Sequence, residues 1–435
     1  MKFPDGFLWG VATSSFQIEG ATGVDGREPS IWDGFVGESG DTGDRGTGHY
    51  ERWREDVDLI ASLGVNAYRF SISWPRMRDP RGVAFYDRLI DGLLERGIEP
   101  VVTLYHWDLP ARLDWRDRST AEQFAEYATD CYEAFGDRVN WWLTINEPWI
   151  SGLLGYLLGL HAPGVRDDLR AEATVFHHLL YAHGLAVQSF RASGRDGMIG
   201  LAPNLMPHYP ATDDPADAEA VRGSEGYVNR WFLDAIFRGA YPEDQAALYE
   251  ERIGPLDFVR DGDLATIAAP TDFLGVNYYA PRWMRAAPGD TPWPWKVVVP
   301  EGVASTGGFT GGVARTEAGT PIWPSGLTDL LVWIRDRYGD VPILITENGA
   351  VFSEPLHDER RIAFVREHLE AVHAALERGV DVRGYCHWSL MDNFEWALGY
   401  GQRFGLVHVD YDTLERTVKD SGRWYAEVAR RGELP

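Results

Sequence analysis

The sequence predicts an α/β fold, a single (β/α)8 TIM barrel spanning residues 1–435. Short apolar runs that end in polar residues alternate with segments of helical period, which is the pattern of repeated βαβ units. No Gly/Pro/Ser-rich linker divides the chain, and barrels of this kind can exceed about 400 residues as one domain. One closed barrel therefore explains the length better than two or three separate domains.

Eight apolar runs are the expected strands. In chain order they are Leu8 to Thr13, Ala67 to Ile72, Pro100 to Tyr105, Val139 to Ile145, Met198 to Pro203, Asp272 to Tyr279, Pro342 to Thr346 and Val382 to Leu390. The expected helices are Trp53 to Leu63, Phe85 to Arg96, Ala121 to Phe135, Ala171 to Ala192, Ala216 to Phe237, Leu327 to Tyr338, Arg360 to Arg378 and Asp420 to Arg430. A long irregular stretch at about 280–324 follows the sixth strand. Loops of such length are usually functional or disordered, and we expect it to wall an active-site mouth.

Composition narrows the possible partners and cofactors. Hydrophobic residues make up 44% and charged residues 25%, as in ordinary globular proteins, and the net charge of −25 disfavours nucleic acid and anionic membranes as partners. Two cysteines, Cys131 and Cys386, cannot form a disulfide framework, and the start of the chain lacks an apolar signal core, so we expect a cytoplasmic protein.

Dinucleotide and Walker motifs are missing, and His177, His178 and His183 lack zinc-protease spacing. We therefore expect no cofactor and no metal.

Polar and aromatic side chains follow most of the expected strands. In a parallel barrel the active site lies at the C-terminal ends of the strands, because every strand delivers its last side chains to the same face. This rule selects Gln17, Glu19, Arg69, His106, Trp107, Asn146, Glu147, Asn277, Tyr279, Glu347, Asn348, Trp388, Glu395 and Trp396.

Two of these residues form a carboxylate pair at strand ends. Glu147 ends the fourth strand and Glu347 the seventh, and each stands beside an asparagine. A single glutamate at a strand end is more often part of a loop salt bridge. Glycoside hydrolysis, however, needs one proton donor and one anion around an oxocarbenium-like transition state, and this pair could supply both.

The motifs around these residues resemble those of the retaining β-glycosidases of glycoside hydrolase family 1, and they run in family order along essentially the whole chain. The matching segments are Phe7-Leu8-Trp9-Gly10, Ser15-Phe16-Gln17-Ile18-Glu19-Gly20, Tyr68-Arg69-Phe70-Ser71-Ile72-Ser73-Trp74-Pro75-Arg76, Leu104-Tyr105-His106-Trp107-Asp108-Leu109-Pro110, Thr144-Ile145-Asn146-Glu147-Pro148, Asn277-Tyr278-Tyr279, Ile345-Thr346-Glu347-Asn348-Gly349, Trp388-Ser389-Leu390-Met391-Asp392-Asn393-Phe394-Glu395-Trp396 and Arg403-Phe404-Gly405-Leu406.

The resemblance implies a role for each matching residue. Glu147 would be the general acid/base and Glu347 the nucleophile, with Arg69 keeping Glu347 anionic and with Asn277 and Tyr279 supporting it. The implied sugar-binding residues are Gln17, His106, Trp107, Asn146, Trp388, Glu395, Trp396 and Phe404. The resemblance also implies a small-molecule β-glycoside as substrate, cleaved with retention, and carboxyl groups about 5 to 5.5 Å apart.

One retained residue and two departures from the family pattern bear on specificity. Glu395 would repel a phosphate, so an unphosphorylated sugar is favoured. Thr320 stands where relatives commonly carry a leaving-group-site tryptophan, and Leu398 where many carry glutamate. The sequence leaves open the preferred hexose, a monomer or a homo-oligomer, and two other activities: a non-catalytic sugar-binding barrel and an enzyme that transfers sugars to acceptors other than water.

Overall fold

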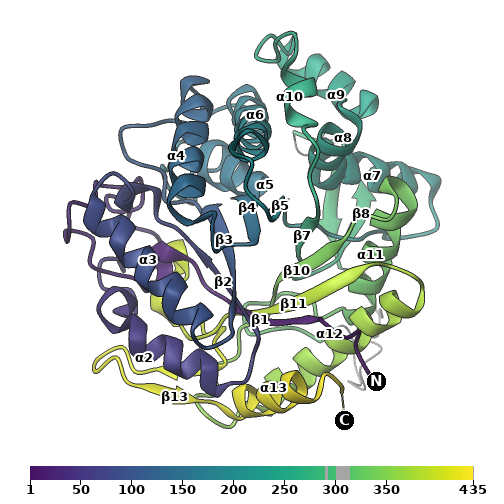
Figure 1. Ribbon diagram of the computed structural model, residues 1–435. Coiled ribbons are helices and arrows are strands. Elements are labelled where there is room, and N and C mark those ends of the chain that lie inside the picture. Colours follow the sequence, from purple (N-terminus) through teal and green to yellow (C-terminus); the bar gives the residue numbers. More distant parts are fainter. Residues whose placement is uncertain (290–291, 300–313, 435) are drawn as a thin grey trace.

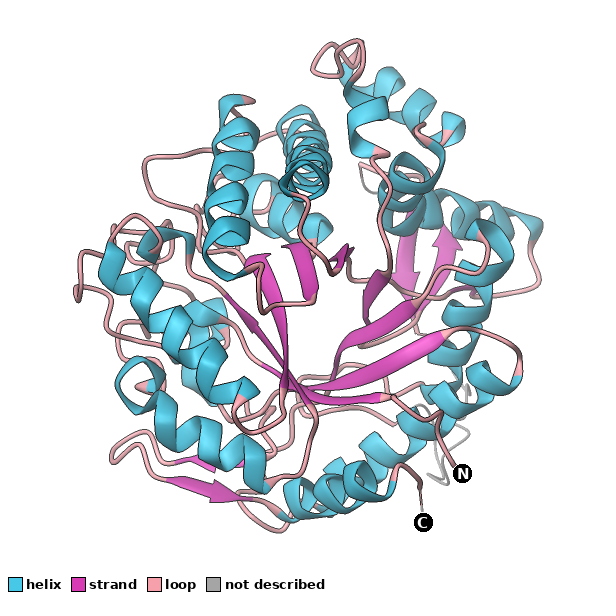
Figure 2. Cartoon of the chain, in the orientation of Figure 1, coloured by secondary structure: helices cyan, strands magenta, loops and turns pink. Residues whose placement is uncertain are grey.

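The computed structural model describes residues 1–289, 292–299 and 314–434. Strands form a central ring and helices surround it (Figure 1, Figure 2). The ring strands are β1 (Leu8–Ala12), β2 (Ala67–Ser71), β3 (Glu99–Tyr105), β4 (Trp141–Asn146), β5 (Met198–Ala202), β7 (Leu274–Asn277), β10 (Ile343–Asn348) and β11 (Val382–Trp388). Their hydrogen-bonded order is β5-β4-β3-β2-β1-β11-β10-β7, and all of these pairs are parallel. The eight predicted strands and the barrel are confirmed.

Backbone hydrogen bonds join the two ends of this strand order. The amide of Asn277 donates to the carbonyl of Pro203 at 3.1 Å, and the amide of Leu205 donates to the carbonyl of Asn277 at 3.1 Å. The sheet is therefore nearly closed between β5 and β7, and the C-terminal ends of all its strands open on one side.

The predicted outer helices are present, with ends shifted by a few residues. They are α2 (His49–Ser62), α3 (Pro80–Leu94), α4 (Ser119–Phe135), α6 (Leu169–Ser193), α7 (Pro215–Glu225), α8 (Trp231–Arg238), α11 (Pro324–Tyr338), α12 (Glu359–Glu377) and α13 (Asp420–Arg431). Helix α3 starts earlier than its apolar period suggests, because Asp79 caps it, accepting from the amide of Arg81, and Pro80 occupies the first turn.

Two sequence-based expectations were wrong in detail. The helix expected from Ala216 to Phe237 is interrupted by a π turn, Gly226–Arg230, which the apolar period of the sequence does not reveal. The stretch at 280–324 is not wholly irregular, because β8 (Arg282–Ala286) and β9 (Trp295–Val298) form a small sheet with β6 (His208–Pro210). Strands this short give little periodic signal in the sequence.

Short elements that the sequence pattern did not resolve complete the fold. They are α1 (Ser15–Ile18), α5 (Pro148–Gly152), the π turn Leu153–Leu157, α9 (Glu243–Ile253), α10 (Asp263–Ile267), β12 (Val407–Val409), β13 (Arg416–Val418) and 3₁₀ turns at Trp74–Arg76 and Trp396–Gly401. Several of them lie after barrel strands and shape the open end.

The barrel interior is packed, so it is not a pore. A separate buried cluster of Ala67, Val101, Leu143, Ala202, Phe273 and Leu344 lies apart from the main core, which fills the space between the strands and the helices. Cys131 and Cys386 are buried free thiols, as the sequence suggested. Among the described residues, none of the helices combines the length and the apolar character needed to cross a membrane.

Candidate active site

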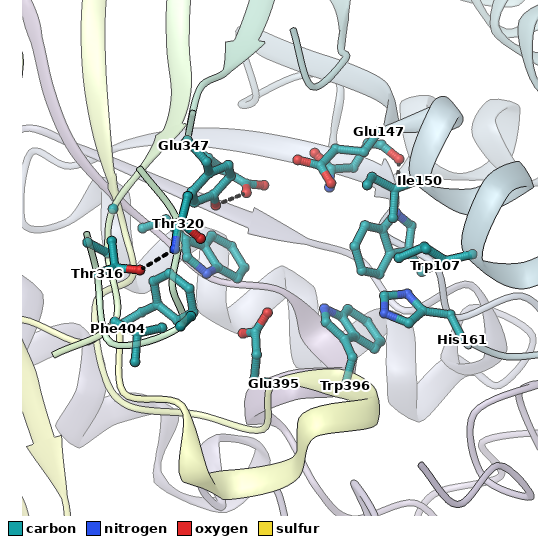
Figure 3. A pocket seen from close by; sticks show the side chains of 18 of the residues that line it. Trp107, Glu147, Ile150, His161, Thr316, Thr320, Glu347, Glu395, Trp396 and Phe404 are labelled. Carbon is teal, nitrogen blue, oxygen red and sulfur yellow. Dashed lines mark hydrogen bonds between the residues drawn. The ribbon is translucent and has the colours of Figure 1, made fainter. Parts of the chain in front are cut away.

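One cavity of about 260 Å³ opens at the C-terminal ends of the barrel strands (Figure 3). Eleven of the residues singled out in the sequence line it: His106, Trp107, Asn146, Glu147, Tyr279, Thr320, Glu347, Trp388, Glu395, Trp396 and Phe404. Arg69, Asn277 and Gln17 are buried and are not among its described lining residues. The fold thus brings side chains from β3, β4, β10 and β11 to one site.

Glu147 lies at the junction between β4 and α5. Its backbone adopts the left-handed conformation, with φ 47° and ψ 63°, which is uncommon outside glycine. Pro148 then starts α5, and the amide of Glu147 donates to the carbonyl of Ala202 at 2.8 Å. Backbone strain of this kind persists only where the surroundings hold it, and it clusters at functional sites.

Glu347 lies within β10, where the strand's pairing is irregular. The register of β10 against β7 shifts between Ile345 and Glu347. An irregularity of this kind redirects a side chain. The Arg69 guanidinium lies 2.5 Å from Oε1 of Glu347, and the Tyr279 hydroxyl donates to Oε2 at 2.6 Å. Two donors therefore hold this buried carboxylate, and the expected contact of Glu347 with Arg69 is present.

A hydrogen-bonded chain links the two carboxyl groups. Arg69 also donates to Oδ1 of Asn146 at 2.7 Å, and the amide of Asn277 donates to that same oxygen at 3.0 Å and to Oε1 of Glu147 at 2.7 Å. Asn277 was expected to support Glu347. It is the register partner of Glu347 between β7 and β10, and its side-chain amide bonds Glu147. The strand position of Asn277 could be deduced from the sequence, whereas the choice between two nearby carboxylates depends on the packed geometry.

The electrostatic surroundings of the two glutamates differ. Burial raises the pKa of Glu147 well above its usual value, and the negative charge of Glu347 raises it further. Glu347 instead forms an ion pair with Arg69, which is fully buried. A proton is therefore favoured on Glu147 and a negative charge on Glu347.

Neutral polar groups and aromatic rings form the rest of the expected sugar site. Burial and the charge of Arg69 hold the pKa of His106 well below its usual value, so this imidazole is neutral. Its Nε2 lies 3.1 Å from Nδ2 of Asn146, and its Nδ1 has no partner among the described residues. The His106 ring stacks on Trp388 with centroids 5.6 Å apart, and Trp107 packs on Trp396 at 4.7 Å.

Glu395 is the third carboxyl group in the cavity. Burial and the charge of Glu347 raise the pKa of Glu395 to about 8. Gln17 lies behind it, and the Gln17 amide donates to Asn393 Oδ1, to the Phe394 carbonyl and, at 3.4 Å, to Glu395. The Gln17 amide nitrogen thus already donates to groups of the protein, whereas Glu395 faces the cavity.

Two residues selected by the strand-end rule lie elsewhere. Glu19 follows the short helix α1 and turns away from the barrel axis to bind Arg76 at 2.6 Å and the Tyr86 hydroxyl at 2.6 Å. Asn348 bonds with Tyr385 and with the carbonyl of Tyr278. Neither residue lines the cavity, and both side chains are bonded within the fold.

Several lining residues were missed in the sequence. They are Ile150, Leu154, His161, Thr316, Ala318, Gly349, Ala350 and Val351. Ile150 and Leu154 are spaced one helical turn apart directly after Glu147, which was a usable signal. Thr316, Ala318 and Thr320 come from the 280–324 stretch that was expected to wall the mouth, while its glycine cluster at 307–312 lies outside the described residues.

The three histidines of α6 have partners within the fold. His177 bonds with Tyr241 and Asp263, His178 with the carbonyl of Trp115, and His183 with Thr144. In the part of the chain that the structure describes, His, Cys, Asp and Glu side chains form no group of three or more that could hold a metal ion.

Comparison with known proteins gives consistent matches over the full chain. The family model for glycosyl hydrolase family 1 matches residues 1–434. "Beta-glucosidase A" of Acetivibrio thermocellus is 42% identical over 99% of this chain and 98% of its own length, and "Beta-glucosidase A" of Thermotoga maritima is 42% identical over 100% and 99%.

Solved structures agree with the sequence matches. The family 1 β-glucosidase of Exiguobacterium antarcticum superposes with a TM-score of 0.94 at 42% identity, covering 100% of both chains. The family 1 β-glucosidase of Thermotoga maritima superposes with a TM-score of 0.92 at 41% identity, covering 100% of this chain and 99% of its own. The chain therefore belongs to glycosyl hydrolase family 1 and is a glycoside hydrolase.

Proposed function

We propose that the enzyme releases terminal, non-reducing β-linked glucose, or a closely related hexose, from glucosides and short oligosaccharides by double displacement. The observation that carries this proposal is the carboxyl pair in one cavity, with Glu347 held by Arg69 and Glu147 held in an environment that favours its protonated form. Relatives matched over their full length are named β-glucosidases, which supports glucose as the sugar.

In the first step Glu347 attacks the anomeric carbon of the bound sugar. The bond from that carbon to the leaving-group oxygen breaks, and Glu147 transfers its proton to this oxygen. Arg69 and Tyr279 orient Glu347 and keep it charged before the attack. The products are the free alcohol and a glycosyl ester of Glu347.

In the second step water displaces Glu347 from the anomeric carbon of the sugar. Once the negative charge of Glu347 is lost in the ester, one of the causes that raise the pKa of Glu147 is removed. Glu147, now a carboxylate, takes a proton from water as the water oxygen attacks the anomeric carbon, and Glu347 leaves. Two inversions restore the β configuration.

The remaining cavity residues are proposed to bind the sugar. His106 and Glu395 are buried groups that can exchange hydrogen bonds with hydroxyls, and Trp388 and Trp396 offer ring surfaces for the sugar's C–H faces. A carboxyl group at Glu395 disfavours a phosphorylated sugar. A cytoplasmic location remains part of the proposal, supported by the buried free thiols.

Retention can be tested directly by the anomer released. Proton NMR of a fresh digest of an aryl β-glucoside is expected to show β-glucose first, with the α anomer growing only at the rate of mutarotation. A retaining pathway requires two displacements at the anomeric carbon, and each inverts it. Initial release of α-glucose would instead indicate a single displacement by water and would contradict the role of Glu347 as nucleophile.

Glu395 is expected to contribute to sugar binding by accepting hydrogen bonds from hydroxyls. Because the pKa of Glu395 is raised to about 8, its carboxyl group is largely neutral near pH 7. Glu395→Ala should therefore lower kcat/KM for an aryl β-glucoside by about 2- to 10-fold for each hydrogen bond removed, since a neutral hydrogen bond contributes about 0.5–1.5 kcal/mol. The decrease should be smaller for the deoxy-glucoside that lacks the bound hydroxyl. Glu219→Ala, an exposed glutamate of α7, is the control. Equal activity of the Glu395→Ala variant and the control would contradict the assignment.

A further inference from the structure

Arg361 is a charged side chain that is completely buried outside the cavity. It lies in the first turn of α12, an outer helix of the barrel (Figure 1), and is 0% exposed. Its Nε donates to Oδ2 of Asp358 at 2.9 Å. A guanidinium group carries five N–H donors in a fixed planar fork, and a buried charge is costly unless its donors have partners. The partners of Arg361 therefore indicate what this residue holds in place.

The terminal nitrogens of Arg361 donate to backbone carbonyls of two loops. Two of these carbonyls belong to Ala350 and Phe352, after β10, at 2.5 and 3.1 Å. The other two belong to Arg403 and Phe404, which follow β11 at some distance, and both lie 3.0 Å away. Together with the ion pair, these bonds use all five donors. The guanidinium group thus links two loops that are about 50 residues apart in the chain.

The loop after β10 lines the cavity directly beside the proposed nucleophile. Ala350 comes three residues after Glu347 and is one of the lining residues. Gly349, between them, lies against the backbone of Trp388, so that a Cβ at this position would come within 1.7 Å of the Trp388 carbonyl oxygen. The carbonyl bond from Arg361 to Ala350 therefore fixes a segment that packs between the ends of β10 and β11.

The second loop contacts the nucleophile through Tyr279. Phe404 lines the cavity, and its ring meets the ring of Tyr279 edge-on, with centroids 6.4 Å apart (Figure 3 labels Phe404 and Glu347). Both rings pack on the buried cluster that contains Trp388. The Tyr279 hydroxyl donates to Oε2 of Glu347 at 2.6 Å. A shift of the Phe404 backbone would therefore change the packing of the residue that donates to Glu347.

We propose that Arg361 is a positioning residue for the nucleophile side of the sugar site. By linking the two loops, its guanidinium group holds Tyr279 and Glu347 in the geometry that attacks the anomeric carbon. The inference deepens the proposed function and rests on it. Arg361 is not among the described lining residues, so it acts through its partners and not on the substrate. Lysine could not replace it, because an ammonium group has at most three donors and no planar fork.

Other bonds should keep the fold intact when Arg361 is changed. Asp358 also accepts from the amide and the hydroxyl of Ser421, at 2.9 and 2.6 Å, so its carboxylate retains two donors. The amide of Gly405 donates to Oδ1 of Asp392 at 3.0 Å, which anchors the second loop independently. We therefore expect Arg361 variants to fold with the two loops attached but less well aligned.

The test measures the rate for each competent active site. The burst of dinitrophenol from 2,4-dinitrophenyl 2-deoxy-2-fluoro-β-D-glucoside counts these sites, because the fluorinated sugar ester on Glu347 is hydrolysed slowly. In Arg361→Ala, kcat/KM per site should fall by about 10- to 100-fold, the effect of a misplacement of about 1 Å. The decrease should be similar for methyl and 2,4-dinitrophenyl β-D-glucoside, since the second leaving group needs no proton and reports the attack by Glu347. Arg361→Lys keeps the charge beside Asp358 and should still lose about tenfold.

Arg416 provides a matched control. It is a buried arginine that pairs with Asp56 at 2.8 Å and donates to the carbonyls of Thr47 and Leu414, and none of these residues lines the cavity. Arg416→Ala should lower the Tm but leave kcat/KM per site unchanged, because it removes a comparable network elsewhere in the fold.

Two results would overturn the inference while leaving the proposed function intact. The first is wild-type kcat/KM per site in Arg361→Ala, or in Arg361→Lys if the alanine variant does not fold. The second is a decrease confined to methyl glucoside, which would place the effect on the proton donor, Glu147. Failure of the wild type to hydrolyse any glucoside would instead contradict the proposed function itself.

Discussion

Replacing Glu347 by glutamine is expected to lower kcat/KM for 4-nitrophenyl β-D-glucoside by about 10⁴- to 10⁶-fold, the range seen when a nucleophile is removed from a catalytic unit. The glutamine amide oxygen can still accept from Arg69 in the position of Oε1, and the NH2 group that replaces Oε2 can donate to the Tyr279 hydroxyl, so the buried guanidinium keeps a partner and the fold is preserved. What is lost is the negative charge that forms the bond to the anomeric carbon. Release of 4-nitrophenol at saturating and limiting substrate measures the effect.

A smaller side chain at the same position gives a sharper test of the role. In Glu347→Gly, added azide has room to attack from the vacated face, and a single displacement should yield the α-glucosyl azide. Glu377→Gln, an exposed glutamate of α12, is the matched control and should keep wild-type activity. Wild-type turnover by Glu347→Gln, or a β-glucosyl azide from Glu347→Gly, would contradict the assignment of Glu347 as nucleophile.

The strand ends of this barrel could be predicted because their sequence signals are local. Each apolar run is buried on both sides in a parallel sheet, and the polar residue that ends it must point to the open face or into a hydrogen-bonded wall. Glu147, Glu347 and His106 were located by this rule alone. Glu19 met the same rule and was misplaced, because the short helix after β1 turns its side chain towards Arg76.

The details that the sequence did not supply depend on contacts between distant segments. The side-chain amide of Asn277 bonds Glu147, whereas Arg69 and Tyr279 bond Glu347, and this division of partners is set by how β2, β4, β7 and β10 pack together. His161 lines the cavity because the chain folds back onto Leu154. Backbone hydrogen bonds hold this fold-back, and they do not require particular residue types that could be recognised in the sequence. A single sequence carries no direct record of such pairings, whereas periodicity and strand-end chemistry are visible within a few residues.

The raised pKa of Glu147 should be visible in the pH dependence of the reaction. The first step needs protonated Glu147, so kcat/KM should fall as the pH rises through the pKa of this residue in the free enzyme. Burial and the charge of Glu347 raise that pKa, which moves the alkaline limb to higher pH than an ordinary glutamate would give. In Glu347→Gln the negative neighbour is gone, so a titration of Glu147 by carbonyl infrared difference spectroscopy should show a lower pKa.

Replacing Glu147 by glutamine should separate substrates by their leaving groups. For methyl β-D-glucoside, whose leaving group must be protonated, kcat/KM should fall by about 10²- to 10⁴-fold, the usual contribution of a positioned general acid. For 2,4-dinitrophenyl β-D-glucoside, whose leaving group departs as a stable anion, the first step should be nearly unaffected, and the alkaline limb should disappear because the group that titrates is absent. Hydrolysis of the glycosyl ester then becomes slow, since no base activates water, so a burst of dinitrophenol should precede a slow steady state.

In Glu147→Ala, azide should accelerate that second step, because the covalent sugar is attacked from the face that Glu147 adjoins. The product should be the β-glucosyl azide, the opposite anomer from the one expected with Glu347→Gly. Equal decreases for the two substrates, with no burst, would show that Glu147 is not the proton donor.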